Sequence, residues 1–261
     1  MRLIRGVTDT GGYDMGLIVN ADDFGRSESV NRAICEAFEK GRVNSTTLMA
    51  NMPAAKEAYE LAKKGGFADK VGIHLNITEG MPISSGIRNN PLICGYDGSF
   101  NQAFYHNTKY RLYMDRQSID QIRDEFDAQI RRFLSLGFTN MHIDSHHHVH
   151  TNYPVFTALK ELGTKYDLDY IRLSRNLYKG GSLPNRIYKS IFNAGVKKLA
   201  GSTSDLFGSY KDFISYPREE LKALINSKTI EIMIHPMYGE DRALMDTDIP
   251  ISEEIFDIAG L

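Results

Sequence analysis

Short apolar runs alternate with amphipathic stretches along most of the chain. Seven of these runs are brief and rich in β-branched or aromatic residues, which is typical of buried strands. Helical periodicity fills most of the intervals between them, so the pattern predicts a parallel sheet with helical crossovers, either doubly wound or closed into a barrel. The predicted strands cover residues 17–19, 45–50, 71–75, 141–144, 170–173, 206–207 and 230–234.

The predicted helices have recognisable starts and ends. The first spans about 27–40, with Val30, Ile34 and Phe38 on one face. Ser118 followed by Gln121 forms a capping-box pattern, which predicts the start of a long amphipathic helix. Further helices are expected from Pro53 to Gly65, from Pro154, over 185–199 and from Pro217.

The segment at about 77–117 shows no clear periodicity and carries Gly, Pro, Asn and Tyr. A stretch of this length is rarely an idle connection, so we expect it to form part of a binding surface. No linker rich in Ser, Gly or Pro divides the rest of the chain. The sequence therefore predicts one domain over 16–261, preceded by a disordered tail at 1–15.

Composition narrows the class of protein. The chain has 261 residues, a net charge of −2, 42% hydrophobic and 25% charged residues, an ordinary globular mix without the basic excess that nucleic-acid binding needs. Two cysteines cannot cross-link a chain this large, and they suit a reducing compartment. No apolar run reaches the length of a membrane span or of a signal-peptide core. We expect a soluble cytoplasmic protein with neither nucleic-acid nor membrane partners.

Potential catalytic chemistry is concentrated at the predicted carboxyl ends of the strands, where parallel α/β folds build their sites. Seven of the eight histidines lie at three of these ends, and only His106 lies elsewhere. Two adjacent carboxylates, Asp22 and Asp23, end the first strand. Neighbours in a strand point to opposite faces, so both can serve one site only where the chain leaves the strand, and Gly25 permits such a bend. A helix-capping role for one of them is the alternative.

The histidine-rich segment that follows the fourth strand is the most specific signal. His142, Asp144 and His146 share one strand face, and if that face points inward, His146 is a metal ligand and Asp144 orients either a ligand or the general acid from behind. His74 and His235 end two other strands, where isolated histidines also occur in structural roles. One carboxylate and two neutral imidazoles suit Zn²⁺, Co²⁺, Ni²⁺ or Mn²⁺, whereas Mg²⁺ normally prefers more oxygen ligands. Such an ion lowers the pKa of a bound water, leaving one aspartate as the general base and His235 as a candidate acid.

These residues resemble a known family. The segments Asn20–Gly25, Ser45–Thr47, Gly72–Leu75, His142–His148 and Ile234–Pro236 occur in the order and spacing of the YdjC-like carbohydrate deacetylases, whose best-characterised members act on chitooligosaccharides. The resemblance covers about residues 17–237. It implies a single-domain, distorted (β/α) barrel of about seven parallel strands, similar to polysaccharide deacetylases.

The resemblance also implies a reaction and roles for residues. It implies metal-dependent hydrolysis of the acetyl group of an N-acetylglucosamine-type mono- or oligosaccharide, in which metal-bound water attacks the amide. Asp23, His74 and His146 match the metal ligands, Asp22 the base and His235 the acid. Either Mg²⁺ or Zn²⁺ is compatible with the family.

Two other readings of the same residues stay open at this point. A glycosidase or phosphoglycosidase would use the two carboxylates without a metal, and a non-catalytic sugar- or metal-binding protein would need no spare base. Arg172 and Arg175 are candidates to contact an anionic substrate group. The chain has no Trp, so a sugar ring would stack on Tyr or Phe, with Tyr96, Phe104 and Tyr105 as candidates. The oligomeric state is open, and a homodimer is one option.

Overall fold

The computed structural model describes residues 16–178, 180 and 182–257, so the predicted tail at 1–15 lies outside the described residues. Seven parallel strands form the central sheet in the order β5-β4-β3-β2-β1-β7-β6. All seven coincide with predicted strands. Their bounds are Leu17–Phe24 (β1), Ser45–Leu48 (β2), Val71–Leu75 (β3), His142–Ser145 (β4), Tyr170–Ile171 (β5), Leu206–Ser209 (β6) and Ile230–Ile234 (β7).

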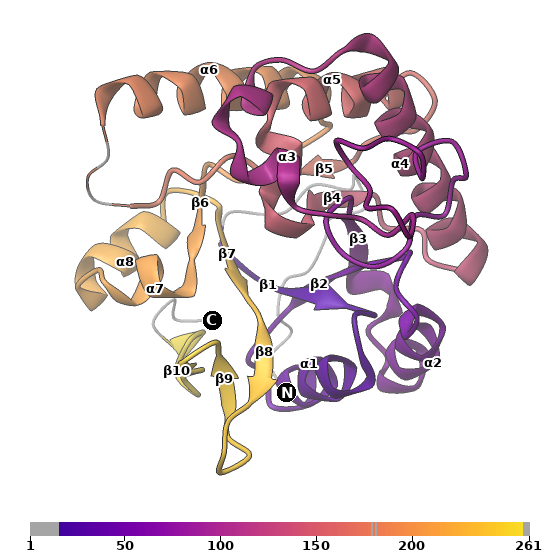
Figure 1. The fold of residues 1–261 in the computed structure, drawn as a ribbon. Helices are drawn as coiled ribbons and strands as arrows, with labels where there is room; N and C mark the ends of the chain where they lie inside the picture. The colour runs from indigo at the N-terminus through magenta and orange to yellow at the C-terminus, as the bar shows by residue number, and fades with distance from the viewer. Residues whose placement is uncertain (1–15, 179, 181, 258–261) are drawn as a thin grey trace.

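The sheet is curled into a half-barrel with helices around its outside (Figure 1), which confirms the predicted fold class. Its two edge strands, β5 and β6, are not neighbours in the sheet. The chain that follows β5 links the two edges, because the backbone amides of Asn176 and Leu177 both donate to the Phe207 carbonyl. Tyr170 and Ser202 add a single parallel bridge. Hydrogen bonds of an irregular segment thus replace a strand ladder at this point.

The helices match the predicted set at most of their positions, and short ones appear that no periodicity indicated. The capping-box prediction at Ser118 is wrong. The long helix begins two residues earlier, and the Asp115 carboxylate caps it by accepting from the Ser118 amide at 2.9 Å. The helices are Glu28–Glu39 (α1), Ala55–Gly65 (α2), Ala103–His106 (α3), Arg116–Leu136 (α4), Tyr153–Leu162 (α5), Leu183–Leu199 (α6), Tyr210–Ile214 (α7) and Arg218–Ile225 (α8), with short 3-10 turns at Ala68–Lys70 (η1), Thr108–Arg111 (η2) and His146–Thr151 (η3).

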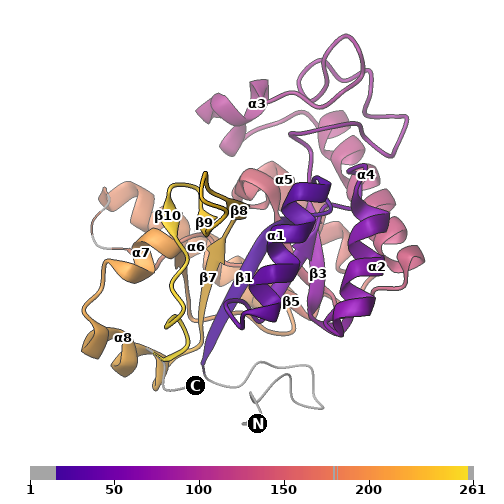
Figure 2. The ribbon, with the colours of Figure 1, turned by 90° about the horizontal axis from the view of Figure 1, so that it is seen from below.

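The long segment between β3 and α4 projects as a lobe at one end of the sheet and carries α3 and η2 (Figure 2). It begins at the carboxyl end of β3, on the side where the candidate chemistry was predicted. Several of its apolar side chains, among them Ile87, Ile93 and Phe104, are fully buried. The lobe is therefore a packed structure with a core, and it stands beside the site.

Three short strands after β7 form a second sheet that the sequence did not predict. Pro236–Tyr238 (β8), Leu244–Asp246 (β9) and Ile249–Pro250 (β10) pair antiparallel. Strands of two or three residues are too short for a period-two pattern to reveal them. This small sheet brings Asp246 back to the end of β7.

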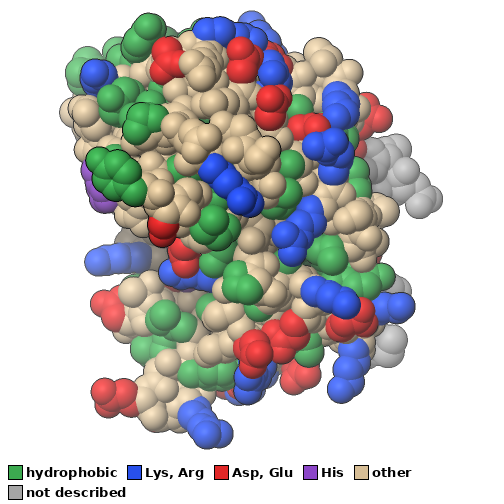
Figure 3. Space-filling view, turned by 45° about the vertical axis from the view of Figure 1, so that its right-hand side comes forward, with side chains coloured by type: hydrophobic (Ala, Val, Ile, Leu, Met, Phe, Trp, Pro, Cys, Tyr) green, Lys and Arg blue, Asp and Glu red, His purple; other side chains and the backbone are tan. Residues whose placement is uncertain are grey.

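Acidic and basic side chains are interspersed over the face seen in Figure 3, without a continuous area of one sign. In the described part of the chain, no helix combines the length and apolar character needed to cross a bilayer. The cytoplasmic location, the lack of nucleic-acid partners and the homodimer stay predictions, as does the single-domain boundary at 16–261.

Candidate metal centre and adjoining pocket

The candidate site lies where β1, β3, β4 and β7 end. The ladders align these ends, because His74 in β3 lies beside Asp144 in β4 and Ala21 in β1 lies beside Ile234 in β7. Asp22 comes directly after Ala21 and His235 directly after Ile234, so these two residues lie side by side at the ends of adjacent strands. The predicted site residues come from two pairs of neighbouring strands, β4-β3 and β1-β7, with β2 between the pairs, and all but His235 are buried.

A bulge in β1 explains how two consecutive aspartates reach one site. Ala21 pairs with Thr46 and Phe24 with Leu48, so β1 has one residue more than β2 across this interval. Asp23 has φ = 71°, in the left-handed region that few non-glycine residues adopt. The strand continues to Phe24, so the prediction that the chain leaves the strand at the aspartates is wrong. The bulge turns both carboxylates toward the site instead.

Asp23, His74 and His146 form a compact group of potential metal ligands. One atom from each lies within 4.8 Å of the others, and all three residues are buried. Asp23 Oδ1 lies 2.8 Å from His146 Nδ1 and 3.3 Å from His74 Nε2. Burial opposes ionisation of Asp23, but hydrogen bonds from His146 and His74 hold its pKa well below the usual range. The group therefore offers one carboxylate and two imidazoles.

His74 is oriented from behind by Asp144. Nδ1 of His74 lies 2.6 Å from Asp144 Oδ1, and the Thr47 hydroxyl donates to Asp144 Oδ2 at 2.9 Å. When His74 is neutral, this bond keeps the proton on Nδ1 and leaves the Nε2 lone pair directed at Asp23. Burial opposes protonation of His74, but the charge and hydrogen bond of Asp144 raise its pKa to about 10.

Asp22 is held by Arg172, the residue that directly follows β5. Both guanidinium terminal nitrogens contact its carboxylate, at 2.7 and 2.8 Å, and the Asn20 amide donates to Oδ1 at 2.8 Å. Burial opposes ionisation, yet the charge of Arg172 holds the pKa of Asp22 far below its usual range. Asp22 is therefore a carboxylate at any ordinary pH.

Arg172 is fully buried and joins three carboxylates. Besides Asp22, it contacts Asp144 at 2.6 Å and Glu231 at 2.6 Å. Asp22, His74 and Asp144 also form a group with metal-ligand spacing, but Arg172 already supplies the positive charge there. A second cation would meet its repulsion, so the geometry favours the group that contains Asp23.

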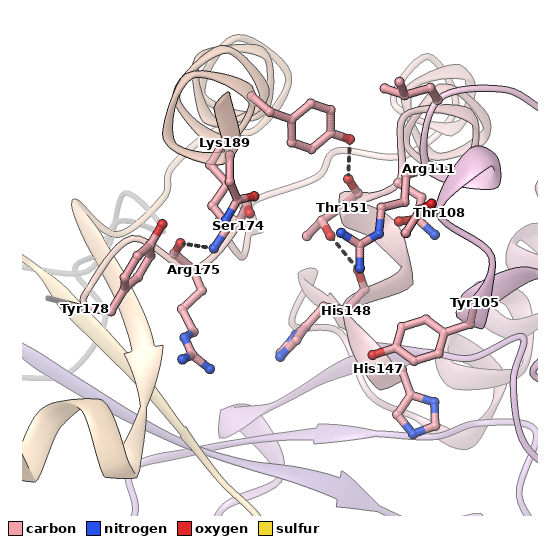
Figure 4. Close-up of a pocket in the computed structure, with 14 residues that line it drawn as sticks. Tyr105, Thr108, Arg111, His147, His148, Thr151, Ser174, Arg175, Tyr178 and Lys189 are labelled. Atoms are coloured by element: carbon pink, nitrogen blue, oxygen red, sulfur yellow. Dashed lines mark hydrogen bonds between the residues drawn. The ribbon is translucent and has the colours of Figure 1, made fainter. Parts of the chain in front are cut away.

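The histidine-rich segment forms a tight turn, η3, after β4. His147 and His148 both have φ = 53°, and this turn separates the directions of consecutive imidazoles. His148 points into the adjoining pocket (Figure 4), and its Nδ1 is buried without a hydrogen-bond partner among the described residues. His150 points away from the candidate metal ligands, with Nδ1 2.6 Å from the Ser145 hydroxyl and Nε2 3.1 Å from the Arg172 carbonyl.

His235 is fixed by the small sheet. Asp246 Oδ1 accepts from the His235 amide at 2.8 Å and lies 3.3 Å from Nδ1 of its ring. The side chain is 41% exposed. Loss of solvent opposes protonation, but the hydrogen bond with Asp246 and the charges of Asp22 and Asp23 raise the pKa of His235. It is thus the imidazole best suited to carry a proton at the open side of the site.

An ion pair that the sequence did not predict covers the metal-ligand group. Glu79 Oε2 lies 3.1 Å from His146 Nε2, and Arg26 contacts both Glu79, at 2.9 Å, and Asp23, at 3.3 Å. Glu79 belongs to the segment after β3 that the sequence assigned to the binding surface. Nothing in its local pattern distinguishes it from a surface glutamate.

A cavity of about 530 Å³ opens beside His147 and His148. Figure 4 shows Tyr105 and His147 on one side of it and Tyr178 and Lys189 on the other. Tyr105 stacks on His147 with ring centroids 5.1 Å apart. The residues that line the cavity are Tyr105, Thr108, Arg111, Leu112, His147, His148, Thr151, Asn152, Ser174, Arg175, Tyr178, Asn185, Tyr188 and Lys189.

Of the aromatic and arginine residues predicted to contact a substrate, some line the cavity and others do not. Tyr105 lines the cavity, whereas Phe104 is fully buried in the core and Tyr96 is exposed and is not among the lining residues. Arg175 lines the cavity and pairs with Asp212 at 2.9 Å. Arg172 has no exposed surface and serves the carboxylates instead.

Arg172 and Glu231 are functional candidates whose roles the sequence analysis missed. Both lie in or directly after short apolar strands, where a charged side chain must find a buried partner. That signal is present in the runs 170–173 and 230–234, and it predicts a pair although it does not say which residues pair.

Comparison with known proteins gives consistent matches over most of the chain. A family model described as YdjC-like protein matches residues 16–256. Proteins named carbohydrate deacetylase are 36% identical in Halalkalibacterium halodurans over 87% of both chains, and 36% identical in Thermoanaerobacter pseudethanolicus over 86% of this chain and 82% of that protein. A solved structure from Enterococcus faecalis, whose description proposes cellobiose-phosphate cleavage, superposes with a TM-score of 0.67 at 26% identity, covering 94% of this chain and 93% of that one.

Proposed function

Because this chain belongs to the YdjC-like protein family, we propose that it is a metal-dependent carbohydrate deacetylase that hydrolyses the N-acetyl group of an amino sugar. The single observation that carries this proposal is the buried Asp23, His74 and His146 group, with Asp22 and His235 at the adjoining strand ends. The names of the curated relatives support the substrate class.

The donor set fits a divalent cation. Asp23 supplies one negative charge, and Asp144 fixes His74 so that Nε2 is the atom left to bind. When bound, the ion supplies Lewis-acid chemistry, polarising a carbonyl and making a water more acidic. Zn²⁺ and Mg²⁺ are the proposed ions, and the two imidazoles favour Zn²⁺ or another transition metal.

Asp22 is the proposed general base. Arg172 donates to both oxygens of the Asp22 carboxylate and Asn20 donates to Oδ1, which together fix its direction. Oδ2 has two lone pairs and accepts one bond from Arg172, so it retains room for a water. Because the pKa of Asp22 is held low, it is always ready to accept a proton, although it is a weak base. A water of lowered pKa compensates for that weakness.

His235 is the proposed general acid. Asp246 orients its ring, and its raised pKa keeps a proton available for the departing amine. Its exposed side chain lies where substrate can reach it. In this proposal one proton passes from water to Asp22, and another passes from His235 to the amine nitrogen.

The glycosidase alternative fits this site less well. It requires one carboxyl group that keeps its proton to act as the acid. Arg172 holds the pKa of Asp22 low, and the imidazoles of His146 and His74 do the same for Asp23, although burial opposes ionisation of both. Neither carboxyl group can therefore serve as the proton donor.

An assay that follows two products tests the proposal. Purified protein with Zn²⁺ or Mg²⁺ is incubated with N-acetylglucosamine and its β-linked oligomers, and free acetate is measured beside newly formed reducing ends. We expect acetate without new reducing ends, and no acetate after chelation. New reducing ends without acetate would replace the proposal with the glycosidase, and binding without either product would favour the non-catalytic reading.

A further inference from the structure

The two imidazoles of the metal-ligand group each lie between Asp23 and a second carboxylate. In His74, Nε2 lies 3.3 Å from Asp23 Oδ1, and Nδ1 lies 2.6 Å from Asp144 Oδ1. In His146, Nδ1 lies 2.8 Å from the same Asp23 oxygen, and Nε2 lies 3.1 Å from Glu79 Oε2. The two rings therefore have the same surroundings with their nitrogens exchanged.

The exchange of nitrogens decides which atom of His146 can bind an ion. A ligand nitrogen must be free of its proton, and the other ring nitrogen of a metal-bound histidine usually donates to a carboxylate, which fixes the tautomer and raises the basicity of the ligand. Asp144 fulfils this condition for His74. Glu79 fulfils it for His146 from the opposite nitrogen, so that Nδ1 is the atom left for the ion.

Glu79 is held in place by its backbone, so its contact with His146 is built into the fold. The fully buried Asn76 accepts from the Glu79 amide at 3.1 Å and donates to the Glu79 carbonyl at 2.7 Å, and Asn51 donates to the same carbonyl at 3.1 Å. Gln129 of α4 in turn accepts from the Asn76 amide and donates to its carbonyl, at 2.9 and 2.6 Å. The first turn of the lobe is thereby fixed to β3 and α4.

Arg26 engages the oxygens that the imidazole of His146 does not use. Its Nε lies 2.9 Å from Glu79 Oε1, and one of its terminal nitrogens lies 3.3 Å from Asp23 Oδ2. The other oxygen of each carboxylate, Oε2 of Glu79 and Oδ1 of Asp23, faces His146. Arg26 thus fixes the directions of both carboxylates without occupying either nitrogen of the ring.

We propose that Glu79 is a positioning residue that keeps the proton of His146 on Nε2 and presents Nδ1 to the metal ion, so that the lobe takes part in metal binding. The inference rests on the metal centre of the proposed function. Loss of such a carboxylate lowers metal affinity by about 10–100-fold. The Glu79 side chain is 29% exposed, whereas that of Asp144 has no exposed surface. Water can partly replace Glu79, so we expect an effect near tenfold.

The Zn²⁺ affinity of the whole chain, measured by competition with a chelator, tests this role. Glu79→Ala should bind Zn²⁺ about tenfold more weakly than the wild-type protein. Glu79→Gln should lie between the two, because its amide oxygen still accepts from Nε2. Asp97→Ala is the control, since Asp97 is an exposed carboxylate of the same lobe that accepts from Ser99, and it should leave the affinity unchanged.

Three results of this titration would overturn the inference. Wild-type affinity in Glu79→Ala would show that the contact with His146 does not support metal binding. An equal loss in Glu79→Gln and Glu79→Ala would assign the effect to the charge of Glu79 instead of its hydrogen bond. An equal loss in Asp97→Ala would assign it to the lobe as a whole.

The tautomer of His146 is a second readout, which a merely structural role of Glu79 would not set. In imidazole nitrogen NMR spectra of the Zn²⁺-loaded wild-type protein, we expect the proton of His146 on Nε2 and that of His74 on Nδ1. A proton on Nδ1 of His146 would overturn the inference. If the wild-type protein binds no Zn²⁺, the metal centre and the proposed function fail with it. If it binds Zn²⁺ and releases acetate while Glu79→Ala keeps full affinity, the inference alone fails.

Discussion

Replacing Asp22 by asparagine removes the carboxylate that is the proposed base and that accepts hydrogen bonds from two nitrogens of Arg172. In the wild-type protein both oxygens accept from the guanidinium, at 2.7 and 2.8 Å. In Asp22→Asn, one oxygen becomes an amide that is itself a donor, so one of these bonds is lost whichever way the amide is turned. The substitution therefore affects both the chemistry and the stability of the protein.

The stability cost can be bounded from the contacts. A net hydrogen bond between charged groups contributes about 1.5–3 kcal/mol, which corresponds to a fall in Tm of roughly 3–12 °C for a chain of this size. Arg172 keeps its contacts with Asp144 and Glu231, both at 2.6 Å. Its charge is therefore not left unpaired, and the larger penalty of an orphaned buried ion does not apply.

The activity should fall much further than this loss of stability would cause. Removal of a positioned general base lowers kcat by about 10²–10⁴, at a temperature where the variant is still folded. Metal content should stay at the wild-type level, because Asp22 is outside the Asp23, His74 and His146 group. Asp23→Asn is the matched variant, and it should lose metal because a neutral amide is a poorer ligand than a carboxylate.

The assay measures acetate release, metal per protein and Tm for both variants beside the wild-type protein. The reasoning is refuted if Asp22→Asn turns over the N-acetyl sugar normally, or if it loses as much metal as Asp23→Asn. A Tm unchanged in Asp22→Asn would contradict the stability argument alone, because it would mean that the Arg172 contacts carry no net free energy.

Three further results are expected. His146→Ala should lower metal content strongly and His150→Ala should not, since His150 bonds Ser145 and a carbonyl; elemental analysis showing the reverse would invalidate the assigned ligand. Burial opposes ionisation of Glu231, but the charge of Arg172 lowers its pKa to about 2. The ionised Glu231 therefore adds about 3 kcal/mol to the free energy of unfolding above pH 4.5, and this stabilisation is lost as the pH falls toward 2. The free energy of unfolding should accordingly fall less steeply with acid in Glu231→Gln than in the wild-type protein. Asp115→Ala should cost about 1 kcal/mol by removing the α4 cap, and an unchanged denaturant midpoint would exclude that capping role.

The sequence predicted the main sheet because six of its seven strands are buried along their whole length. Several of them, such as β1, β3 and β7, are rich in apolar β-branched residues, and all seven predicted strands were found at their positions. The small sheet after β7 was missed because its strands have two or three residues and one face in solvent. The start of α4 was missed because Asp115 and Ser118 both fit an N-cap pattern, and only the backbone distinguishes them.

The candidate site was predictable in its residue types but not in its geometry. Asp23, His74 and His146 were predicted to share one site because they lie at the ends of predicted strands. The structure places one ligand atom of each within 4.8 Å of the others. The bulge at Asp23 and the left-handed turn at His147 and His148 could not be predicted, because neither carries the glycine that usually marks such backbone. Glu79 and Asp246 reach the site from loops and short strands, whose paths depend on tertiary packing.

The charges buried around the site explain why a divalent cation suits it. Asp22, Asp144 and Glu231 are buried carboxylates that contact the buried Arg172, and the buried Asp23 lies beside them in contact with Arg26. The guanidinium of Arg172 cannot balance three carboxylates, so positive charge is drawn to the imidazoles beside them. Burial opposes it, yet the neighbouring carboxylates raise the pKa of both His74 and His146. A divalent cation would displace those protons and supply the same charge at the same place, which links the buried network around Arg172 to the proposed chemistry at the strand ends.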